Sequence, residues 1–432
     1  MPKILVTTFG TTGDMLPSLR LCKELTRRGH EMKFAVNPSQ VETVRGWGFE
    51  AVAIGPWIDH HTWTRAFERG TPDNINTAKT VAALIEEVYK PVLSGTYPDF
   101  EVLVPDCDFV LANPLALWAA PACERHAKTY AVIHMMGIGI PSRHYPPPRF
   151  IKLPFLKTLY NVTTWEMTRA ALWMVYTSPM SKTYEGLGLK VPRHLFLDDS
   201  LSPHLNILAL DPLWFKPSPD WAPRNVVQTG FIRPDPAENS AVPAEVREFV
   251  ERGGGRPLLI FAFGSMMGVG ARHTYEPFVE VARRKGFRVL IVEGWGGPTG
   301  LAAEDVLSVP YAPYQWLFER ASVVVHHGGT GTVSDCLWAG VPQIILAHGF
   351  DQPDNGLRVE GLGCGRWMHL RHVKPSRFEK VLDDVAGNLP AYHQRVREVE
   401  GRLWRDGLER AADAFERLSG RSTPEHALLA RA

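Results

Sequence analysis

Short apolar runs recur along the chain and alternate with longer segments in which apolar residues follow a helical period. The runs occupy residues 3–9, 32–36, 109–112, 130–134, 258–263, 287–292, 306–309, 322–325 and 343–346. Runs of this length, rich in Val and Ile, are typical of strands buried on both faces of a parallel sheet. Because they alternate with segments such as 77–89, 115–126 and 333–339, the pattern predicts an α/β fold with doubly wound sheets.

Proline and glycine indicate where several elements end. Pro17 suits the first turn of a helix that runs to Arg28, and Pro91 closes the predicted helix at 77–89. Prolines also cluster between residues 211 and 243, which is typical of an extended connector between domains. The run at 258–263 then repeats the opening order of strand, glycine turn and helix. We therefore expect a first domain at 1–215, a linker at 216–242, a second domain at 243–400 and a terminal helix within 401–432.

Composition narrows the class of protein. The 432 residues suffice for two domains, and 45% hydrophobic with 22% charged residues are globular values. A net charge of +1 gives no reason to expect nucleic acid. Five cysteines without close pairing predict neither a disulfide framework nor a zinc site. With no secretory signal and no apolar run of membrane length, the expected location is the cytoplasm.

The segment from His326 to Thr332, His-His-Gly-Gly-Thr-Gly-Thr, follows one of the buried runs directly and precedes a predicted helix. The free N–H groups and the positive dipole end of such a helix suit a phosphate or pyrophosphate. Glycines let the backbone approach the ligand, and His327, Thr330 and Thr332 can donate hydrogen bonds. The alternative is an ordinary strand-to-helix turn with a buried histidine.

A second loop favours the ligand interpretation. The next run, 343–346, leads to Asp351 and Gln352. Loops that follow successive parallel strands reach the same edge of the sheet, where ligands bind. A carboxylate and a carboxamide together can hold neighbouring hydroxyls, because one accepts hydrogen bonds and the other both donates and accepts. A pyrophosphate beside a polyol describes a nucleotide-sugar.

The glycine turn and the Asp-Gln loop both lie between Tyr311 and about Gly365. This stretch resembles the donor-binding signature of family 1 glycosyltransferases with the GT-B fold. The order His-Gly-Gly-x-Gly-Thr, Gly-Val-Pro and Asp-Gln is closest to the bacterial branch with glycopeptide, sterol and rhamnolipid-type transferases. The resemblance implies two Rossmann-like domains that face each other across a cleft. It also implies that the helix within 401–432 packs back on the first domain.

The same resemblance assigns roles to individual residues. The donor diphosphate is expected at His327, Gly329, Thr330, Gly331, Thr332 and Ser265, the sugar at Asp351 and Gln352, and the nucleoside at Tyr311, Ala312, Trp316 and Asp335. Three points stay open: either Tyr311 or Trp316 stacks on the base, Ser265 is equally well a simple turn serine, and Asp335 is equally well a solvated helix acid.

The first loop, Gly10-x-x-Gly13-Asp14-x-x-Pro17, resembles the family's first-loop motif. Local sequence alone predicts that Asp14 caps the helix that follows it. In the matching branch, however, an Asp stands where plant members have a catalytic His. Asp14 is therefore the expected general base, which takes the proton of the attacking acceptor hydroxyl. The resemblance further implies inversion at the anomeric carbon.

Residues 137–180 depart from the regular alternation and are rich in proline and aromatic residues. They indicate either a proline-broken loop followed by core helices or an apolar acceptor pocket. The candidate acceptor-binding residues are Met135, Met136, Phe150, Trp165 and Trp118. Arg149, Lys152 and Lys157 beside the aromatics allow peripheral membrane contact. The Asp106/Asp108 pair is expected to be a strand-edge turn, and no metal is predicted.

Together the patterns predict an inverting, metal-independent glycosyltransferase without a cofactor. Its donor is a UDP- or dTDP-sugar, and its acceptor is an apolar hydroxylated small molecule or lipid. The protein is expected to be a monomer or homodimer. Two alternatives share the architecture: a sugar-nucleotide epimerase, which needs further acid and base groups around the donor sugar, and a non-catalytic activator of another transferase.

Overall fold

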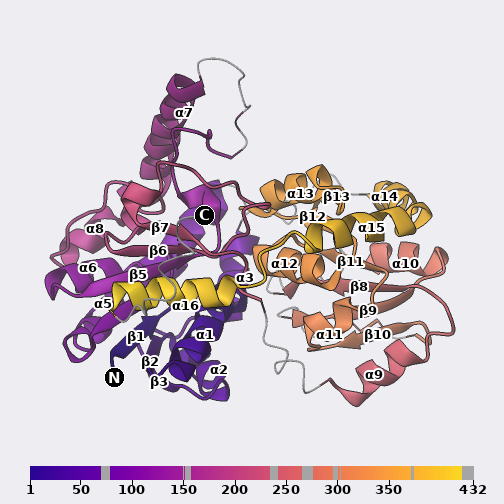
Figure 1. Ribbon diagram of the computed structural model, residues 1–432, viewed down its shortest axis with the longest axis horizontal. Helices are drawn as coiled ribbons and strands as arrows, with labels where there is room; N and C mark the ends of the chain where they lie inside the picture. Colours follow the sequence, from indigo (N-terminus) through magenta and orange to yellow (C-terminus); the bar gives the residue numbers. More distant parts are fainter. Residues whose placement is uncertain are drawn as a thin grey trace. The chain divides into compact units, whose positions relative to one another are not determined.

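The computed structural model describes residues 1–69, 78–148, 150, 157–233, 242–264, 276–294, 300–301, 303–370 and 374–420 (Figure 1). The chain divides into two compact units. The first comprises Met1–Trp63, Val81–Ile232 and Trp404–Ala432, and the second comprises Thr64–Thr80 and Arg233–Leu403. The prolines of the predicted linker therefore fall on both sides of the division between Ile232 and Arg233.

The first unit contains a parallel sheet with the order β3-β2-β1-β4-β5-β6-β7 in the described residues. Its strands are β1 (Lys3–Thr7), β2 (Glu31–Val36), β3 (Glu50–Ala53), β4 (Phe109–Ala112), β5 (Thr129–His134), β6 (Leu205–Leu208) and β7 (Val226–Gln228). The strand order reverses between β1 and β4, where Ile4 pairs with Phe109 and Thr7 with Ala112. In open α/β sheets, ligands bind beyond the carboxyl ends of the strands at such a reversal.

Helices cover both faces of this sheet. The helices up to β7, with the terminal helix, are α1 (Thr12–Arg27), α2 (Val41–Gly46), α3 (His60–Glu68), α4 (Ala78–Leu84), α5 (Lys90–Glu101), α6 (Ala119–Arg125), α7 (Lys157–Leu172), α8 (Ser178–Gly186) and α16 (Gly407–Leu418). Of these, α3 and α4 extend into Thr64–Thr80, which belongs to the second unit, and α7 projects away from the sheet (Figure 1). Helices α1, α2 and α16 share one core with alternate residues of the strands, while α6 packs against β4 and β5. Figure 1 shows α16 beside α1, and Arg28 of the α1 C-cap binds Asp413 at 2.6 Å and Glu416 at 2.8 Å. The terminal helix thus belongs to the first unit.

The second unit repeats the arrangement with the order β10-β9-β8-β11-β12-β13 among its described strands. These strands are β8 (Leu258–Ala262), β9 (Arg288–Val292), β10 (Val306–Val309), β11 (Val323–His326), β12 (Gln343–Ala347) and β13 (Gly365–His369). The helices are α9 (Ala244–Glu251), α10 (Glu276–Arg284), α11 (Tyr314–Phe318), α12 (Thr330–Ala339), α13 (Gln352–Gly361), α14 (Pro375–Gly387) and α15 (Leu389–Glu400). Leu259 and Phe261 enter one core and Leu258 and Ile260 another, so β8 is buried on both faces. Double burial explains its continuous apolar sequence.

Short 3₁₀ and π-helical segments complete the described structure. The 3₁₀ segments are η1 (Pro38–Gln40), η3 (Val104–Asp106), η4 (Gly137–Gly139), η6 (Asp198–Ser200) and η7 (Ala222–Arg224), and the π-helical ones are η2 (Ile85–Tyr89) and η5 (Trp173–Thr177). None of the described helices has the length and apolarity needed to cross a bilayer.

Two helices differ from the boundaries that their prolines predict. Helix α1 begins at Thr12, so Pro17 lies inside the helix rather than in its first turn. The predicted helix at 77–89 does not end at Pro91: α4 continues through η2 into α5, and Pro91 occupies the first turn of α5. A proline inside a continuous helix removes one backbone hydrogen bond and crowds the carbonyl four residues before it, and here the π-helical segment directly before Pro91 changes the spacing of these groups.

Candidate functional site

The turn after β11 presents an open helix N-terminus. Gly328 has a φ of +95°, and a Cβ on it would lie 2.7 Å from Cγ2 of Ile345, so only glycine fits without strain. Gly329 is the N-cap of α12 and offers no side chain to the first N–H groups. A Cβ on Gly331 would meet no heavy atom within 4 Å. Free N–H groups, a helix dipole and open space together suit an anion.

The two adjacent histidines of this turn have different roles. The N–H of Gly328 donates to Nδ1 of His326 at 3.1 Å, so the proton of this ring lies on Nε2, which donates to Oε1 of Gln343 at 2.9 Å. His326 is fully buried, and burial lowers its pKa to about 3. His327 is half-buried with Nε2 beside Gly329, and burial lowers its pKa to about 4. His327 is therefore the neutral imidazole that faces the glycine turn.

The loop after β12 is tied to the glycine turn by an asparagine that sequence reasoning missed. Nδ2 of Asn355 donates to Oδ2 of Asp351 at 2.9 Å and to the carbonyl of Gly328 at 2.9 Å. The hydroxyl of Thr330 also donates to Oδ2 of Asp351, at 3.2 Å, and accepts from Asn355 at 3.2 Å. The structure thus brings the predicted diphosphate and sugar residues together. Because the Thr330 hydroxyl is already hydrogen-bonded to Asp351 and Asn355, the backbone N–H of Thr330 is the group that can bind an anion.

Gln352 is likewise partly engaged. Its Oε1 accepts hydrogen bonds from the backbone N–H groups of His348 at 2.7 Å and Gly349 at 3.2 Å, and its side chain is buried. The amide oxygen therefore shapes the loop that carries Asp351. Nε2 is the part of Gln352 that is left to donate to a sugar hydroxyl.

The predicted nucleoside residues lie on α11, α12 and the segment before α11. The Trp316 ring has the guanidinium groups of Arg320 and Arg247 over it, at 4.2 and 5.4 Å from the ring centroid. Tyr311 is 59% exposed, whereas Ala312 is buried. Because cations already cover Trp316, the geometry favours Tyr311 as the ring that stacks on a base. Asp335 is half-buried on α12, and Ser265 lies outside the described residues.

In the first unit, Asp14 follows β1 at the point where the strand order reverses. Its Oδ2 accepts from the backbone N–H of Thr11 at 2.7 Å and from the Thr11 hydroxyl at 3.0 Å, which forms a capping box at the start of α1. Burial raises the pKa of Asp14, and the two Thr11 hydrogen bonds oppose this rise. Within the described chain all hydrogen bonds to this carboxylate go to Oδ2. One oxygen is a cap, and the other is left for a ligand.

Aromatic side chains gather next to this loop. The Phe9 ring lies 5.4 Å from Trp63, 6.5 Å from Tyr89 and 5.8 Å from Trp118, centroid to centroid. Trp118 is buried, and its Nε1 donates to the Thr7 hydroxyl at 3.0 Å. Of the five candidate acceptor residues, Trp118 is therefore the one that the structure places in this cluster. Tyr89 was missed, because nothing in its local sequence marks it, whereas Trp63 lies in the aromatic stretch 57–70.

The other four candidates have different surroundings. Trp165 is buried and donates from Nε1 to the Tyr145 carbonyl at 2.8 Å, so it serves the packing of α7. Met135 is half-buried and packs against the core that α1 shares, and Met136 and Phe150 are half-buried.

The pair Asp106/Asp108 lies at the amino end of β4, where Asp108 accepts from the N–H of Lys3 at 2.7 Å. In the described chain no group of three His, Cys, Asp or Glu side chains is placed to hold a metal.

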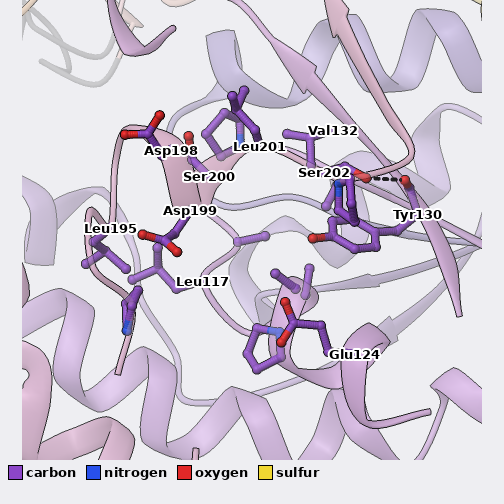
Figure 2. Close-up of a pocket in the computed structure, with 18 of the residues that line it drawn as sticks. Leu117, Glu124, Tyr130, Val132, Leu195, Asp198, Asp199, Ser200, Leu201 and Ser202 are labelled. Carbon is purple, nitrogen blue, oxygen red and sulfur yellow. Dashed lines mark hydrogen bonds between the residues drawn. The ribbon is translucent and has the colours of Figure 1, made fainter. Parts of the chain in front are cut away.

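A cavity of about 870 Å³ lies elsewhere in the first unit, between α6, β5 and residues 188–203 (Figure 2). Figure 2 shows Leu117, Glu124, Tyr130 and Asp199 around it. None of the predicted site residues lines this cavity. It touches the loop of Asp14 only indirectly, through Asn113, whose amide bonds the N–H and carbonyl of Phe9 at 3.2 and 2.7 Å.

The chain is similar in sequence to known glycosyltransferases. Residues 297–403 match the family model of the erythromycin biosynthesis protein CIII-like C-terminal domain. Over 428 residues the chain is 27% identical to glycosyltransferase GtfC of Amycolatopsis orientalis, covering 95% of this chain and 96% of that protein. Over 414 residues it is 26% identical to a sterol 3-beta-glucosyltransferase of Aspergillus terreus, covering 88% of this chain. The alignment spans 27% of the fungal protein, about a quarter of its length.

Solved structures agree as well. The glycotransferase of kitacinnamycin superposes with a TM-score of 0.68 at 20% identity, and the match covers 96% of this chain and 99% of that one. At this level of identity the likeness concerns the fold. The two parallel-sheet units of this chain, matched over nearly the full length of both proteins, form a two-domain architecture of the GT-B type.

Proposed function

Because the chain belongs to the family 1 glycosyltransferases with the GT-B fold, we propose that it transfers a sugar from a UDP- or dTDP-sugar to a hydroxyl of an apolar acceptor, with inversion. The observation that carries the proposal is the junction of the uncapped N-terminus of α12 with the Asp351 loop, which Asn355 ties together. This junction offers anion-binding N–H groups and hydroxyl-binding groups side by side.

The second unit supplies the groups that hold the donor. Backbone N–H groups from Thr330 onward and the neutral His327 ring meet the diphosphate, while Asp351 and Nε2 of Gln352 meet the sugar. As the glycosidic bond breaks, negative charge accumulates on the leaving diphosphate. Preorganised N–H donors and the helix dipole stabilise this charge in the transition state, which lowers the barrier.

The first unit supplies the base. The acceptor hydroxyl gives its proton to Oδ1 of Asp14 as its oxygen forms the bond to the anomeric carbon. Burial raises the pKa of this carboxylate, and a base with a higher pKa takes up a proton more readily.

A screen of UDP- and dTDP-sugars against hydroxylated apolar acceptors, with released nucleoside diphosphate as the readout, tests the proposal. We expect acceptor-dependent release, which Asp14→Asn abolishes while the affinity for the diphosphate is kept. An epimerase would interconvert donor sugars without an acceptor, and a non-catalytic activator would show no turnover with any pair. Either result would refute the proposal.

A further inference from the structure

The outer side of α7 and of η5, which continues this helix, is apolar. Both segments belong to the first unit, and α7 projects away from its sheet (Figure 1). Of the twelve large apolar side chains that are exposed in the described chain, six lie on this stretch: Leu159, Val162, Met167, Trp173, Met174 and Val175. Single exposed apolar residues are normal, whereas a contiguous group indicates a surface that another molecule covers. We call these six residues the α7–η5 face.

The α7–η5 face lacks the charges that a water-exposed helix normally carries. Helix α7 buries Thr164 and Trp165 on its inner side, so its outer side should be polar if it met only water. Between residues 158 and 175, however, the only charged residues are Glu166 and Arg169. They pair with each other at 2.5 Å. The outer side of this helix therefore has no net charge and is mostly apolar.

The π-helical segment η5 extends this surface beyond α7. Such a segment holds one residue more than a regular helical turn, which rotates the side chains after it relative to those before it. The consecutive residues Trp173, Met174 and Val175 are all exposed, while the Tyr176 ring packs against Phe196 at a centroid distance of 5.1 Å. At about 1.5 Å per residue, the α7–η5 face is roughly 25 Å long.

Basic residues flank the start of α7. Residues 143–165 contain four Lys or Arg and no Asp or Glu: Arg143, Arg149, Lys152 and Lys157. Lys157 is the exposed first residue of α7, and the carbonyl of Arg143 accepts from Nδ2 of Asn161 at 2.9 Å. This bond holds the exposed Arg143 beside the first turns of α7, whereas Arg149 and Lys152 lie outside the described residues. Cations at the end of an apolar helix face complement the headgroups of an anionic lipid layer.

We propose that the α7–η5 face binds the surface of a bilayer that contains anionic lipids, with the helix axis in the plane of the membrane. The six apolar side chains enter the boundary between headgroups and acyl chains, and Arg143 and Lys157 bind lipid phosphates. The basic flank favours lipid over a second copy of the chain. A symmetric dimer would place the same cationic patch on both sides of one interface, where like charges repel.

This inference goes beyond the proposed function and does not depend on it. The two are connected by ring contacts within the first unit. Tyr176 of η5 contacts Phe196, which contacts Tyr89 at 5.6 Å, and Tyr89 contacts Phe9 in the loop after β1 at 6.5 Å. A lipid surface that holds η5 thus reaches the unit that is proposed to receive an apolar acceptor, and such molecules dissolve in membranes.

A fluorescent label on the face tests lipid contact directly. All five cysteines are buried, so Met174→Cys introduces one accessible thiol for a nitrobenzoxadiazole label. The matched control is Val102→Cys at the C-cap of α5, where the native side chain is 69% exposed against 62% for Met174. The probes are vesicles of phosphatidylcholine alone and of phosphatidylcholine with about 30% phosphatidylglycerol. We expect the label at 174 to brighten and shift to the blue with the anionic vesicles, and the label at 102 to stay unchanged.

A charge placed on the face tests its contribution to binding. Met167→Asp/Met174→Asp changes two side chains that are 59% and 62% exposed, so the melting temperature should stay unchanged. We expect at least about tenfold weaker co-sedimentation with the anionic vesicles, because carboxylates oppose both apolar insertion and anionic headgroups. Val102→Asp should bind as the wild type does, and added salt should weaken the binding of the wild type.

Three results would overturn the inference. The first is vesicle binding that is equal in the wild type and in Met167→Asp/Met174→Asp. The second is the absence of both co-sedimentation and a change in the label at 174. The third is self-association of the wild type in analytical ultracentrifugation that the two aspartates abolish while no lipid binds, which would assign the α7–η5 face to a second copy. None of these results depends on sugar transfer, so the proposed function is tested separately.

Discussion

The backbone N–H of Gly328 donates to Nδ1 of His326, and this one hydrogen bond distinguishes His326 from its neighbour His327, which faces the glycine turn. With Nδ1 as acceptor and Nε2 bound to Gln343, His326 has no nitrogen left for a ligand. His327 lies on the other side of the chain and faces Gly329. The following substitutions distinguish the two roles.

His327→Ala should weaken nucleoside diphosphate binding about ten- to a hundredfold, because it removes one hydrogen bond to a charged ligand. His326→Ala should instead lower the free energy of unfolding by about 1–3 kcal/mol, since it strands the buried N–H of Gly328 and the amide of Gln343. Titration calorimetry with UDP and chemical unfolding measure the two effects. A stability loss in His327→Ala without a loss of affinity would contradict this division.

Gly329→Ala and Gly331→Ala form a matched pair within one turn. A Cβ on Gly329 would lie 2.5 Å from Nε2 of His327 and displace the ring, whereas a Cβ on Gly331 would meet no described heavy atom within 4 Å. We expect Gly329→Ala to lose at least about tenfold in donor affinity. Gly331→Ala should be as stable as the wild type or up to about 1 kcal/mol more stable, because alanine favours the helix. Thermal melts and calorimetry on both variants provide the check, and an unaltered affinity in Gly329→Ala would count against the site.

The pH dependence of transfer reports on Asp14. The base must be ionised, so kcat/KM should fall as the pH falls through the pKa of Asp14, which lies above its ordinary value of 3.8. Thr11→Val removes a hydrogen bond that lowers this pKa, so the acid limb should move to higher pH. Thr12→Val, at an exposed neighbour, should leave the limb in place. Initial rates measured across the acid range test this prediction. An identical acid limb of the kcat/KM profile in wild type and Thr11→Val would exclude Asp14 as the base.

The second unit should lose stability in acid. Burial lowers the pKa of His326 to about 3, of His327 to about 4 and of His348 to about 3, all below the unfolded value of 6.5. The fold therefore favours the neutral rings: their contribution is complete above pH 6.5 and is lost as the pH falls toward 4 and 3. At pH 5 each ring contributes about 2 kcal/mol less to the free energy of unfolding than it does at neutral pH. Urea unfolding of the full chain at both pH values tests this, and equal stability would disprove it.

The sequence predicts buried strands such as β1, β8 and β11, because they are continuous apolar runs, but it misses the equally buried β6, which has only four residues. It does not reveal β3 or β13, which are short, partly polar edge strands. Pro91 also misleads, since a proline ends a regular helix but is accommodated when a π-helical segment precedes it. Local rules therefore identify the sheet and misplace the helix boundaries that depend on tertiary packing.

In the candidate site, too, some residues are predicted by local sequence patterns and others are not. His327, Gly329 and Asp351 lie in loops that directly follow strands, so their meeting place follows from the parallel sheet alone. Asn355, which ties those loops together, and Tyr89, which reaches the Asp14 loop from a distant helix, depend on contacts that no local pattern encodes. The contacts of Arg247 and Arg320 with the Trp316 ring are also tertiary contacts that no local pattern encodes.

The surplus residue in η2 and in η5 gives this protein an unusual route of divergence. A regular helix that loses one residue shifts everything after it, but a helix that already holds one too many can give it up and become regular. A single-codon deletion within 85–89 would change the direction of the Tyr89 side chain, and one within 173–177 would change that of Tyr176. In both cases every sheet strand would stay in register. Relatives that differ by such deletions should therefore keep both sheets while the side chains of these two helices change direction.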